Sequence, residues 1–525
     1  MAIDLNALQH VGTHAQRDPE RPAIIMGASG ETITYGQLDE RSYKLAAFLS
    51  DQGYAPGDHI AIVMENSADY LIACWAAQRS GLYFTPVNWH LAADEIAYII
   101  EDCDAKCVIA SPTLATVLDA CEARFPKVTL RLVSGAARPN YQSLAAVYGA
   151  AAPVAPLAQC EGMSMMYSSG TTGRPKGIKR PLSGAPMGTL GASDRIVGGL
   201  YQFDASVVLL CPAPLYHGAP LVWAMGALRL GACVVVMEKY EPVEVLRLVE
   251  CYRVTHGHFV PTMFVRMLNL PEEVRNGYDL SSLKLVAHAA APCPVAVKHR
   301  MFEWFGPVIH EYYAGSEGNG FCAVGPQEWL ARPGTVGKAI FGQIHILDDA
   351  GEQLPAGEIG TVYFGGTPAF EYHNDAEKTL AVRNGKGWST LGDYGYVDAE
   401  GYLFLSDRRT DLIISGGVNI YPRETEDVLQ QHLAVLDVAV VGVPSAEFGE
   451  DVVAVVELKP GYEGNEALAA ELISYCREHL SHFKCPRRVS FGTLPRTLTG
   501  KLLHRVVKEE QRRLQQSTKT DAYSC

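Results

Sequence analysis

The sequence predicts an α/β protein with more than one domain. Over residues 206–324, short apolar runs alternate with amphipathic stretches. Buried strands are predicted at Ser206–Leu210, Cys233–Met237, Lys284–His288 and Val308–Tyr312. A helix is predicted over Glu241–Tyr252, because Val243, Leu246 and Val249 recur at three-residue intervals. Strands that alternate with helices favour a mostly parallel sheet with helices on its faces.

The pattern changes in the second half of the chain. From Phe341 to Leu405, short apolar segments are separated by turns rich in Gly and Asp, which predicts antiparallel, barrel-like β-structure. A compact unit then follows, with a helix starting near Arg423, strands at Asp437–Val441 and Val452–Glu457, and a helix at Ala467–His479. We therefore expect a large N-terminal domain over residues 1–407 and a small α+β domain over residues 408–525. The last dozen residues are polar and are expected to fray.

Composition excludes several classes of protein. The 525 residues are too many for one simple core, and the net charge of −14 argues against nonspecific binding to nucleic acid. The longest apolar stretch, Leu221–Met237, is short for a membrane span, and the N-terminus does not resemble a secretory signal. The 13 cysteines form no CxxC pair, so we expect reduced thiols and a cytoplasmic location.

One segment, Tyr167–Gly177, reads YSSGTTGRPKG and carries the features of a phosphate-binding loop. Glycines let the backbone approach a ligand, hydroxyls donate hydrogen bonds, and a lysine adds positive charge. The candidate residues are Ser168, Ser169, Gly170, Thr171, Thr172, Gly173 and Lys176. A flexible surface loop is the plain alternative. A Walker A loop is excluded, because Lys176 is followed by Gly177 rather than by Ser or Thr.

This string resembles the signature of the adenylate-forming superfamily, which includes acyl-CoA synthetases, peptide-synthetase adenylation domains and luciferases. Further motifs of that superfamily follow in order: PAPLYHGAP at Pro212–Pro220, AAAP at Ala289–Pro292, EYYAGSE at Glu311–Glu317, PGTVG at Pro333–Gly337, WSTLGD at Trp388–Asp393, DRRTDLIISGGVNIYPRETE at Asp407–Glu426 and LPRTLTGKLLHR at Leu494–Arg505. The segment Thr34–Leu49 is similar to the family's opening helix. Taken singly, His217 is also compatible with a core histidine, Asp393 with a turn and Lys501 with the surface. The order of the motifs favours the family.

The resemblance implies a site for ATP and Mg²⁺. The adenine pocket would comprise Ala290, Ala291, Pro292, Glu311, Tyr312 and Tyr313. Tyr313 would stack on the base, and Asp393 would accept hydrogen bonds from the ribose. Arg408 would contact ribose or phosphate, and Ser316 would approach the phosphates. Glu317 would hold Mg²⁺, which prefers carboxylate and phosphate oxygens.

The resemblance also implies catalytic residues and a second substrate, coenzyme A. Lys501 would bridge the substrate carboxylate and the α-phosphate, while His217 would line the space between acid and nucleotide. Gly416 and Gly417 would lie beside the pantetheine arm of coenzyme A. The small C-terminal domain would be mobile and would rotate about a hinge near Thr410, where the family more often carries Asp or Lys. A homodimer is a further expectation from the family.

The acid is the least determined substrate. By resemblance, its pocket is lined by Tyr216, His217, Phe259, Met263, Tyr312, Gly315 and Gly318. None of these residues is an obvious charged partner for an amino group, which favours fatty, aromatic, alicyclic or steroid-like acids. The motif PLYHGAP and the DRR start of the hinge segment resemble the fatty-acid and bile-acid-type ligases. The alternatives are an enzyme that loads an acyl carrier protein in trans, an adenylate-binding protein without ligase activity, and a luciferase-type oxygenase.

Overall fold

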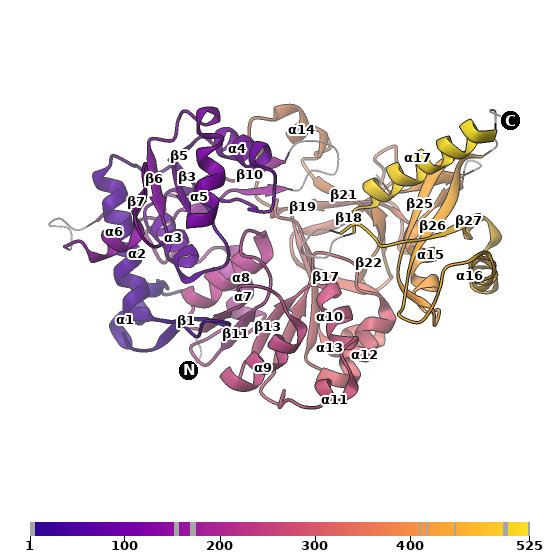
Figure 1. Ribbon diagram of the computed structural model, residues 1–525, viewed down its shortest axis with the longest axis horizontal. Coiled ribbons are helices and arrows are strands. Elements are labelled where there is room, and N and C mark those ends of the chain that lie inside the picture. Colours follow the sequence, from indigo (N-terminus) through magenta and orange to yellow (C-terminus); the bar gives the residue numbers. More distant parts are fainter. Residues whose placement is uncertain are drawn as a thin grey trace. The chain divides into compact units, whose positions relative to one another are not determined.

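The computed structural model describes residues 6–151, 157–168, 175–408, 411–415, 418–445, 448–496 and 502–522 (Figure 1). Only the backbone is described for Ser168, Asp407, Arg408, Val418, Asn419 and residues 516–522. The chain forms two compact units. Unit 1 comprises Met1–Phe259, Asn269–Ala287 and Ala369–Leu380. Unit 2 comprises Val260–Leu268, His288–Pro368 and Ala381–Cys525.

Unit 1 contains two mostly parallel sheets. The first has the strand order β7-β6-β5-β3-β4-β8, and the second has the order β13-β11-β12-β1-β2, in which only β2 runs antiparallel among the pairs described. Their bounds are β1 Pro22–Met26, β2 Thr32–Thr34, β3 His59–Val63, β4 Tyr83–Pro86, β5 Ala105–Ala110, β6 Leu130–Val133, β7 Gln142–Ser143, β8 Met163–Ser164, β11 Val208–Cys211, β12 Cys233–Val236 and β13 His256–Phe259. β14 (Leu285–His288) lies beside β13. The predicted parallel sheet is confirmed, and β12 is buried along its whole length, as a strand covered on both faces must be.

Local chemistry explains where two helices of unit 1, α2 and α9, begin. The helices of this unit are α1 Val11–Arg17, α2 Tyr35–Asp51, α3 Ala68–Arg79, α4 Ala93–Asp102, α5 Pro112–Asp119, α6 Leu144–Gly149, α7 Ala192–Gly199, α8 Gly218–Arg229, α9 Pro242–Tyr252 and α11 Glu272–Arg275. The predicted opening helix is α2, which starts at a capping box between Thr34 and Gln37. The predicted helix α9 starts at Pro242 and ends where Arg253 adopts a left-handed φ of 50°.

Unit 2 begins its β-structure with an antiparallel sheet of strand order β18-β19-β21-β22-β17-β16-β15. The bounds are β15 Ile309–Ala314, β16 Phe321–Val324, β17 Thr335–Phe341, β18 Gln343–Leu347, β19 Gly360–Gly365, β21 Ser389–Val397 and β22 Leu403–Arg408. The helices are α10 Pro261–Leu268, α12 Val295–Phe305 and α13 Pro326–Ala331. α14 (Ala376–Ala381) lies in unit 1 except for its last residue, Ala381. The antiparallel structure predicted from the Gly- and Asp-rich turns is confirmed.

The C-terminal part of unit 2 has its own sheet, of order β24-β23-β26-β25, with β27 parallel to β26. The elements are β23 Ile413–Ser415, β24 Val418–Ile420, α15 Pro422–Leu429, β25 Val435–Ser445, β26 Gly449–Leu458, α16 Glu466–His479, β27 Arg488–Phe491 and α17 His504–Ala522. The α/β class, with a large N-terminal and a small C-terminal domain, is confirmed, whereas the boundary at residue 408 stays a prediction. The last dozen residues, which were expected to fray, instead continue the backbone of α17 as far as Ala522, and Val507 and Gln511 bury one side of this helix further upstream.

Candidate active site

The candidate phosphate loop is anchored at both ends by strands of unit 1. β9 (Met166–Ser168) pairs with β10 (Lys176–Lys179) so that Ser168 lies opposite Lys176, and β10 pairs in turn with β20 (Glu371–Tyr372). Gly177 leaves room for the Tyr167 ring, because a Cβ atom here would lie 3.0 Å from that ring, which is a tight contact. The predicted residues Ser169, Gly170, Thr171, Thr172 and Gly173, and the Ser168 side chain, lie outside the described residues.

Lys176 has a partner that the sequence did not indicate. Its ammonium group forms an ion pair with the carboxylate of Asp375, which follows β20. The hydrogen bond from Lys176 lowers the pKa of the Asp375 carboxyl group. In this structure the lysine is therefore held by a carboxylate, which a bound phosphate would have to replace.

The aromatic–histidine pair lies in the loop that joins β11 to α8. Tyr216 is buried, and the centroids of the Tyr216 and His217 rings are 4.4 Å apart. Burial raises the pKa of the Tyr216 phenol to about 12. His217 is partly exposed and immediately precedes the first turn of α8. The loop follows the carboxyl end of a parallel strand, which is where open α/β sheets bind their ligands.

Phe259 and Met263, two predicted lining residues of the acid pocket, are both buried. Phe259 ends β13 in unit 1, and Met263 lies on α10 in unit 2. Gly315 and Gly318 lie in the turn after β15, where Gly318 has a φ of 67°. A Cβ atom on Gly315 would approach the Leu391 side chain to 2.7 Å, so any larger residue here would have to displace that side chain.

The predicted adenine segment Ala290–Pro292 follows β14 and carries backbone strain. Ala290 adopts a φ of 72°, which is unusual for a residue with a Cβ atom. Both Ala290 and Pro292 are exposed, and Ala291 is partly exposed. Strained, exposed backbone that the surrounding fold maintains is a recurring feature of ligand sites.

β15 and β21 bring together two residues that were predicted separately. The Tyr313 hydroxyl donates a hydrogen bond of 2.5 Å to Oδ2 of Asp393, and Asp393 is buried. Asp393 lies opposite Arg408 in the β21–β22 ladder, although the Arg408 side chain is not among those described. Asp393 and Arg408, which are 15 residues apart, lie on neighbouring strands. Tyr313 reaches Asp393, which is 80 residues away, from β15, although three strands lie between β15 and β21 in the sheet.

Glu311 and Tyr312 precede Tyr313 on β15, and each contacts a residue of a neighbouring element. The Glu311 carboxylate accepts a hydrogen bond of 2.6 Å from the Lys298 ammonium, and both side chains are buried. His288 Nε2 lies 3.6 Å from the same carboxylate. The Tyr312 ring stacks on Phe321, with centroids 5.0 Å apart. Lys298 is a residue that the sequence did not single out, because a lysine on an amphipathic helix is normally exposed.

Ser316 and Glu317 follow β15 in the turn that contains Gly315 and Gly318. Ser316 is exposed and Glu317 is partly exposed. Within the described residues there is no group of three or more His, Cys, Asp and Glu side chains that could hold a metal ion. A single carboxylate suits Mg²⁺, which takes its remaining ligands from phosphates and water.

The last predicted residues, Gly416, Gly417 and Lys501, lie outside the described residues, as does the hinge candidate Thr410. The described residues that flank these positions are held by strand pairing and by an ion pair. Ser415 pairs with Val418 across β23 and β24. Near Lys501, Arg496 pairs with Leu502, and the Arg496 guanidinium binds Asp437 on β25, with Nε and Oδ2 2.9 Å apart. Asp437 and Arg496 were not singled out by the sequence.

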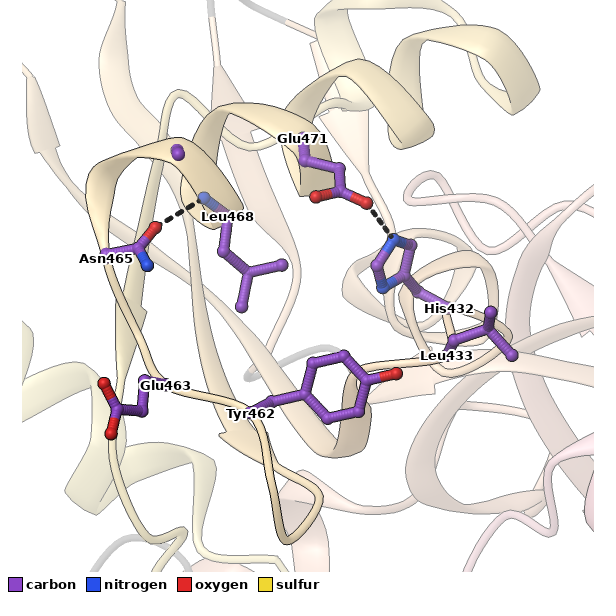
Figure 2. A pocket seen from close by; sticks show the side chains of 8 residues that line it. His432, Leu433, Tyr462, Glu463, Asn465, Leu468 and Glu471 are labelled. Carbon is purple, nitrogen blue, oxygen red and sulfur yellow. Dashed lines mark hydrogen bonds and ion pairs between the residues drawn. The ribbon is translucent and has the colours of Figure 1, made fainter.

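A pocket of about 370 Å³ in the C-terminal part contains none of the predicted residues (Figure 2). It is lined by His432, Leu433, Tyr462, Glu463, Asn465, Ala467, Leu468 and Glu471. His432 pairs with Glu471 at 3.3 Å, and Asn465 accepts a hydrogen bond from the Leu468 amide. Its carboxylates would repel phosphates, so we assign no substrate to it.

In the part of the chain that the structure describes, no helix is long and apolar enough to cross a membrane.

Comparison with known proteins supports the same assignment. The chain matches the AMP-binding enzyme family over residues 11–371 and the AMP-binding enzyme C-terminal domain over residues 424–501. The long-chain-fatty-acid–CoA ligase FadD13 of Mycobacterium tuberculosis is 30% identical over 498 residues, covering 94% of this chain and 96% of that protein. The fatty acid–[acyl-carrier-protein] ligase ScoC of Streptomyces coeruleorubidus is 30% identical over 517 residues, covering 96% of each.

Solved structures agree with these relatives. ATP-bound MatB from Rhodopseudomonas palustris superposes with a TM-score of 0.83 at 28% identity, covering 96% of this chain and 99% of that chain. The anthranilate CoA ligase AuaEII in complex with anthranoyl-AMP gives a TM-score of 0.83 at 26% identity, covering 97% and 99%. The chain therefore belongs to the AMP-binding enzyme family, in its acyl-CoA synthetase branch, and is an AMP-forming acid–thiol ligase.

Proposed function

We propose that the acid activated by this ligase is hydrophobic, and that the residues assigned by resemblance act on it and on ATP. The observation that carries the assignment of the nucleotide site is the hydrogen bond from Tyr313 to Asp393. It joins, in one sheet, the ring assigned to adenine and the carboxylate assigned to ribose. A carboxylate at this position can accept hydrogen bonds from both hydroxyls of a ribose.

Mg²⁺ and the phosphates complete the nucleotide site in this proposal. Glu317 would hold the ion, with phosphate oxygens and water as the other ligands, and the ion would neutralise charge on the phosphates. Ser316 follows the same strand as Tyr313 and would bind a phosphate oxygen. Lys176 would exchange Asp375 for the phosphates of ATP, since both are anionic acceptors of charge-assisted hydrogen bonds.

The chemistry proceeds in two displacements. The substrate carboxylate attacks the α-phosphorus of ATP, and pyrophosphate leaves. The coenzyme A thiolate then attacks the carbonyl carbon of the acyl-adenylate, and AMP leaves with the bonding electron pair. In the first step, Lys501 would stabilise the charge shared by carboxylate and α-phosphate, so catalysis is mainly positioning and electrostatics.

Burial at the assigned acid pocket favours a hydrophobic acid. Tyr216, Phe259, Met263 and Tyr312 are all buried and mainly apolar. No carboxylate is among the assigned lining residues that could pair with the ammonium group of an amino acid. Relatives of this chain are named for long-chain fatty acids, indoleacetate and anthranilate, all of which combine a carboxylate with an apolar body.

A second candidate acceptor is an acyl carrier protein, because ScoC, named as a carrier-protein ligase, is as similar to this chain as FadD13. The two acceptors share the same phosphopantetheine thiol.

For coenzyme A, we propose that Gly416 and Gly417 lie beside the pantetheine arm after the C-terminal domain, residues 408–525, has rotated about a hinge near Thr410. The homodimer and the cytoplasmic location remain predictions.

The decisive experiment measures AMP and pyrophosphate release with Mg-ATP over a panel of fatty, aryl and steroid acids. Coenzyme A, a purified phosphopantetheinylated carrier protein or no thiol is added in parallel. We expect rapid turnover with at least one hydrophobic acid and coenzyme A. Turnover only with the carrier protein would favour the second acceptor, and turnover only with amino acids would refute the hydrophobic acid.

A further inference from the structure

The loop of residues 212–217, which carries Tyr216 and His217, has few hydrogen bonds of its own. Pro212 and Pro214 have no amide hydrogen to donate. The Tyr216 hydroxyl is buried and has no hydrogen-bond partner among the described residues. Within the loop, the His217 amide donates to the Pro214 carbonyl at 3.2 Å. The rest of its conformation therefore needs support from outside the loop.

Asn66 supplies that support with a single side chain. Its Nδ2 donates to the carbonyls of Ala213, at 3.2 Å, and Met237, at 2.8 Å. Its Oδ1 accepts from the Leu215 amide at 2.8 Å. The side chain is buried, so these bonds are protected from competing water. Asn66 thus fastens the loop to the residue that follows β12.

The support itself is firmly built into unit 1. Asn66 lies between β3 and α3, next to Ser67, whose hydroxyl caps α3 by accepting from the Tyr70 amide at 3.3 Å. Nearly all of α3 is buried. Asn66 therefore connects the carboxyl end of β3 in the first sheet with the carboxyl ends of β11 and β12 in the second.

An asparagine is the side chain that matches this arrangement. It combines two N–H donors with an acceptor on a short stem, and the site uses both kinds of group. An aspartate would keep the acceptor but would set a carboxylate oxygen against two carbonyls. A leucine would keep the approximate volume and lose all three bonds, leaving buried backbone groups without partners.

We propose that Asn66 is a positioning residue of the acid-activating site. It acts through the loop, by holding Tyr216 and His217 at the carboxyl ends of β11 and β12. The role rests on the proposed function, which assigns Tyr216 and His217 to the acid. The asparagine thereby contributes to which acids react, in addition to stabilising the fold.

A matched control is available at the opposite end of α8. Tyr35 is fully buried, and its single hydroxyl hydrogen is shared between the carbonyls of Ala232, at 2.8 Å, and Leu228, at 3.0 Å. Tyr35→Phe therefore also removes a buried side-chain donor that two backbone carbonyls share in the same unit. It leaves the loop of residues 212–217 with its bonds to Asn66.

The first test needs no substrate. Hydrogen–deuterium exchange is measured on intact wild type, Asn66→Leu, Asn66→Asp and Tyr35→Phe. We expect the Leu215 amide to exchange about tenfold faster or more in Asn66→Leu, and to be unchanged in Tyr35→Phe. Asn66→Asp keeps the acceptor for this amide and should show a smaller increase. An unchanged Leu215 amide in Asn66→Leu would overturn the proposal, whether or not the protein is a ligase.

The second test uses two hydrophobic acids of different length that the wild type activates. Both Asn66 variants should raise the KM for the acid and change the ratio of kcat/KM between the two acids by about tenfold. The KM for ATP should stay within about twofold. Tyr35→Phe should leave the ratio unaltered. Equal losses of kcat in all variants, with an unaltered ratio, would make Asn66 purely structural. Absence of any acid-dependent turnover in wild type would instead refute the proposed function.

Discussion

The residues assigned to the nucleotide and those assigned to the acid are held in place by different forces. Tyr313 and Asp393 are joined by a hydrogen bond, and Glu311, on the same strand as Tyr313, is paired with Lys298. Phe259 and Met263 are held by apolar burial. Directional bonds accept one ligand geometry, whereas apolar packing discriminates only by size and shape. The difference indicates that ATP recognition is narrowly defined and that acid preference is open to change by single substitutions.

The largest expected effect comes from breaking the polar support under β15. Lys298→Met leaves the Glu311 carboxylate buried without its ammonium partner, which should cost about 3–5 kcal/mol in the free energy of unfolding. Urea denaturation measures this cost. Lys127→Met is the matched control, because Lys127 pairs with Asp104 on the surface and its removal should leave the midpoint unchanged. A Lys298→Met midpoint equal to that of the control would contradict the stabilising role.

Removal of the proposed catalytic lysine should separate the two chemical steps. Lys501→Ala should lower the rate of adenylation by about 10²–10³-fold, as expected for loss of a preorganised positive group. The same variant should still convert preformed acyl-adenylate and coenzyme A to acyl-CoA. Rapid-quench measurement of each half-reaction tests this, with Lys459→Ala as the control lysine. Equal losses in both half-reactions would reject the division of labour.

The Tyr313–Asp393 bond can be tested by a double-mutant cycle. Asp393→Ala should lower kcat/KM for ATP by about 100-fold, because two charge-assisted hydrogen bonds to the ribose are lost. Tyr313→Phe removes only the hydroxyl and should lower it by about fivefold. Steady-state kinetics at saturating acid gives both values. Because the residues act together, the double variant should be little worse than Asp393→Ala, and fully additive losses would separate their roles.

Substitutions in the assigned acid pocket should change which acids the enzyme prefers and should leave nucleotide binding unchanged. Met263→Ala enlarges the assigned pocket, so larger acids should gain on smaller ones by about 10-fold in relative kcat/KM. The KM for ATP should not change. Competition between two acids in one assay measures the ratio directly. An unchanged ratio would remove Met263 from the pocket.

The smallest effect is expected at the strained backbone after β14. Ala290→Gly relieves the left-handed conformation and should raise the free energy of unfolding by up to about 1 kcal/mol. Thermal denaturation measures it, with Ala289→Gly as the neighbouring control. Greater stabilisation by the control than by Ala290→Gly would show that the strain is not stored at Ala290.

Much of the fold followed from local patterns. β12, α9 and α16 were predicted within one or two residues, because their apolar spacing and end residues act over a few positions. α17 was missed, since its polar sequence hides the single face that Val507 and Gln511 bury. The buried face of α17 can be recognised only when the position of the C-terminal sheet, which contacts this helix through β25, is known.

Residues of the candidate site likewise fall into two groups: those that the sequence motifs predicted and those that only the structure revealed. Residues within motifs, such as Tyr313, Asp393 and Lys176, were recognised from order and spacing along the chain. Asn66 and Asp375 were not, because each contacts its partner from a distant segment. Lys298 was not either, although it lies near Glu311 in the sequence, because a lysine on an amphipathic helix is normally exposed. An asparagine before a helix and a lysine on a helix are commonplace in sequence, so they gave no functional signal.

The sequence by itself determined the class of this protein: an ordered series of motifs, alternating strands and helices, and a reaction that begins with adenylation. Only the tertiary structure decided which side chains maintain those motifs, including the clamp of Asn66 on the loop of residues 212–217 and the bond between Tyr313 and Asp393. The physical reason is the difference in sequence separation over which these interactions act. Propensity and periodicity act between residues a few positions apart, whereas hydrogen bonds and ion pairs form between any residues that folding brings together.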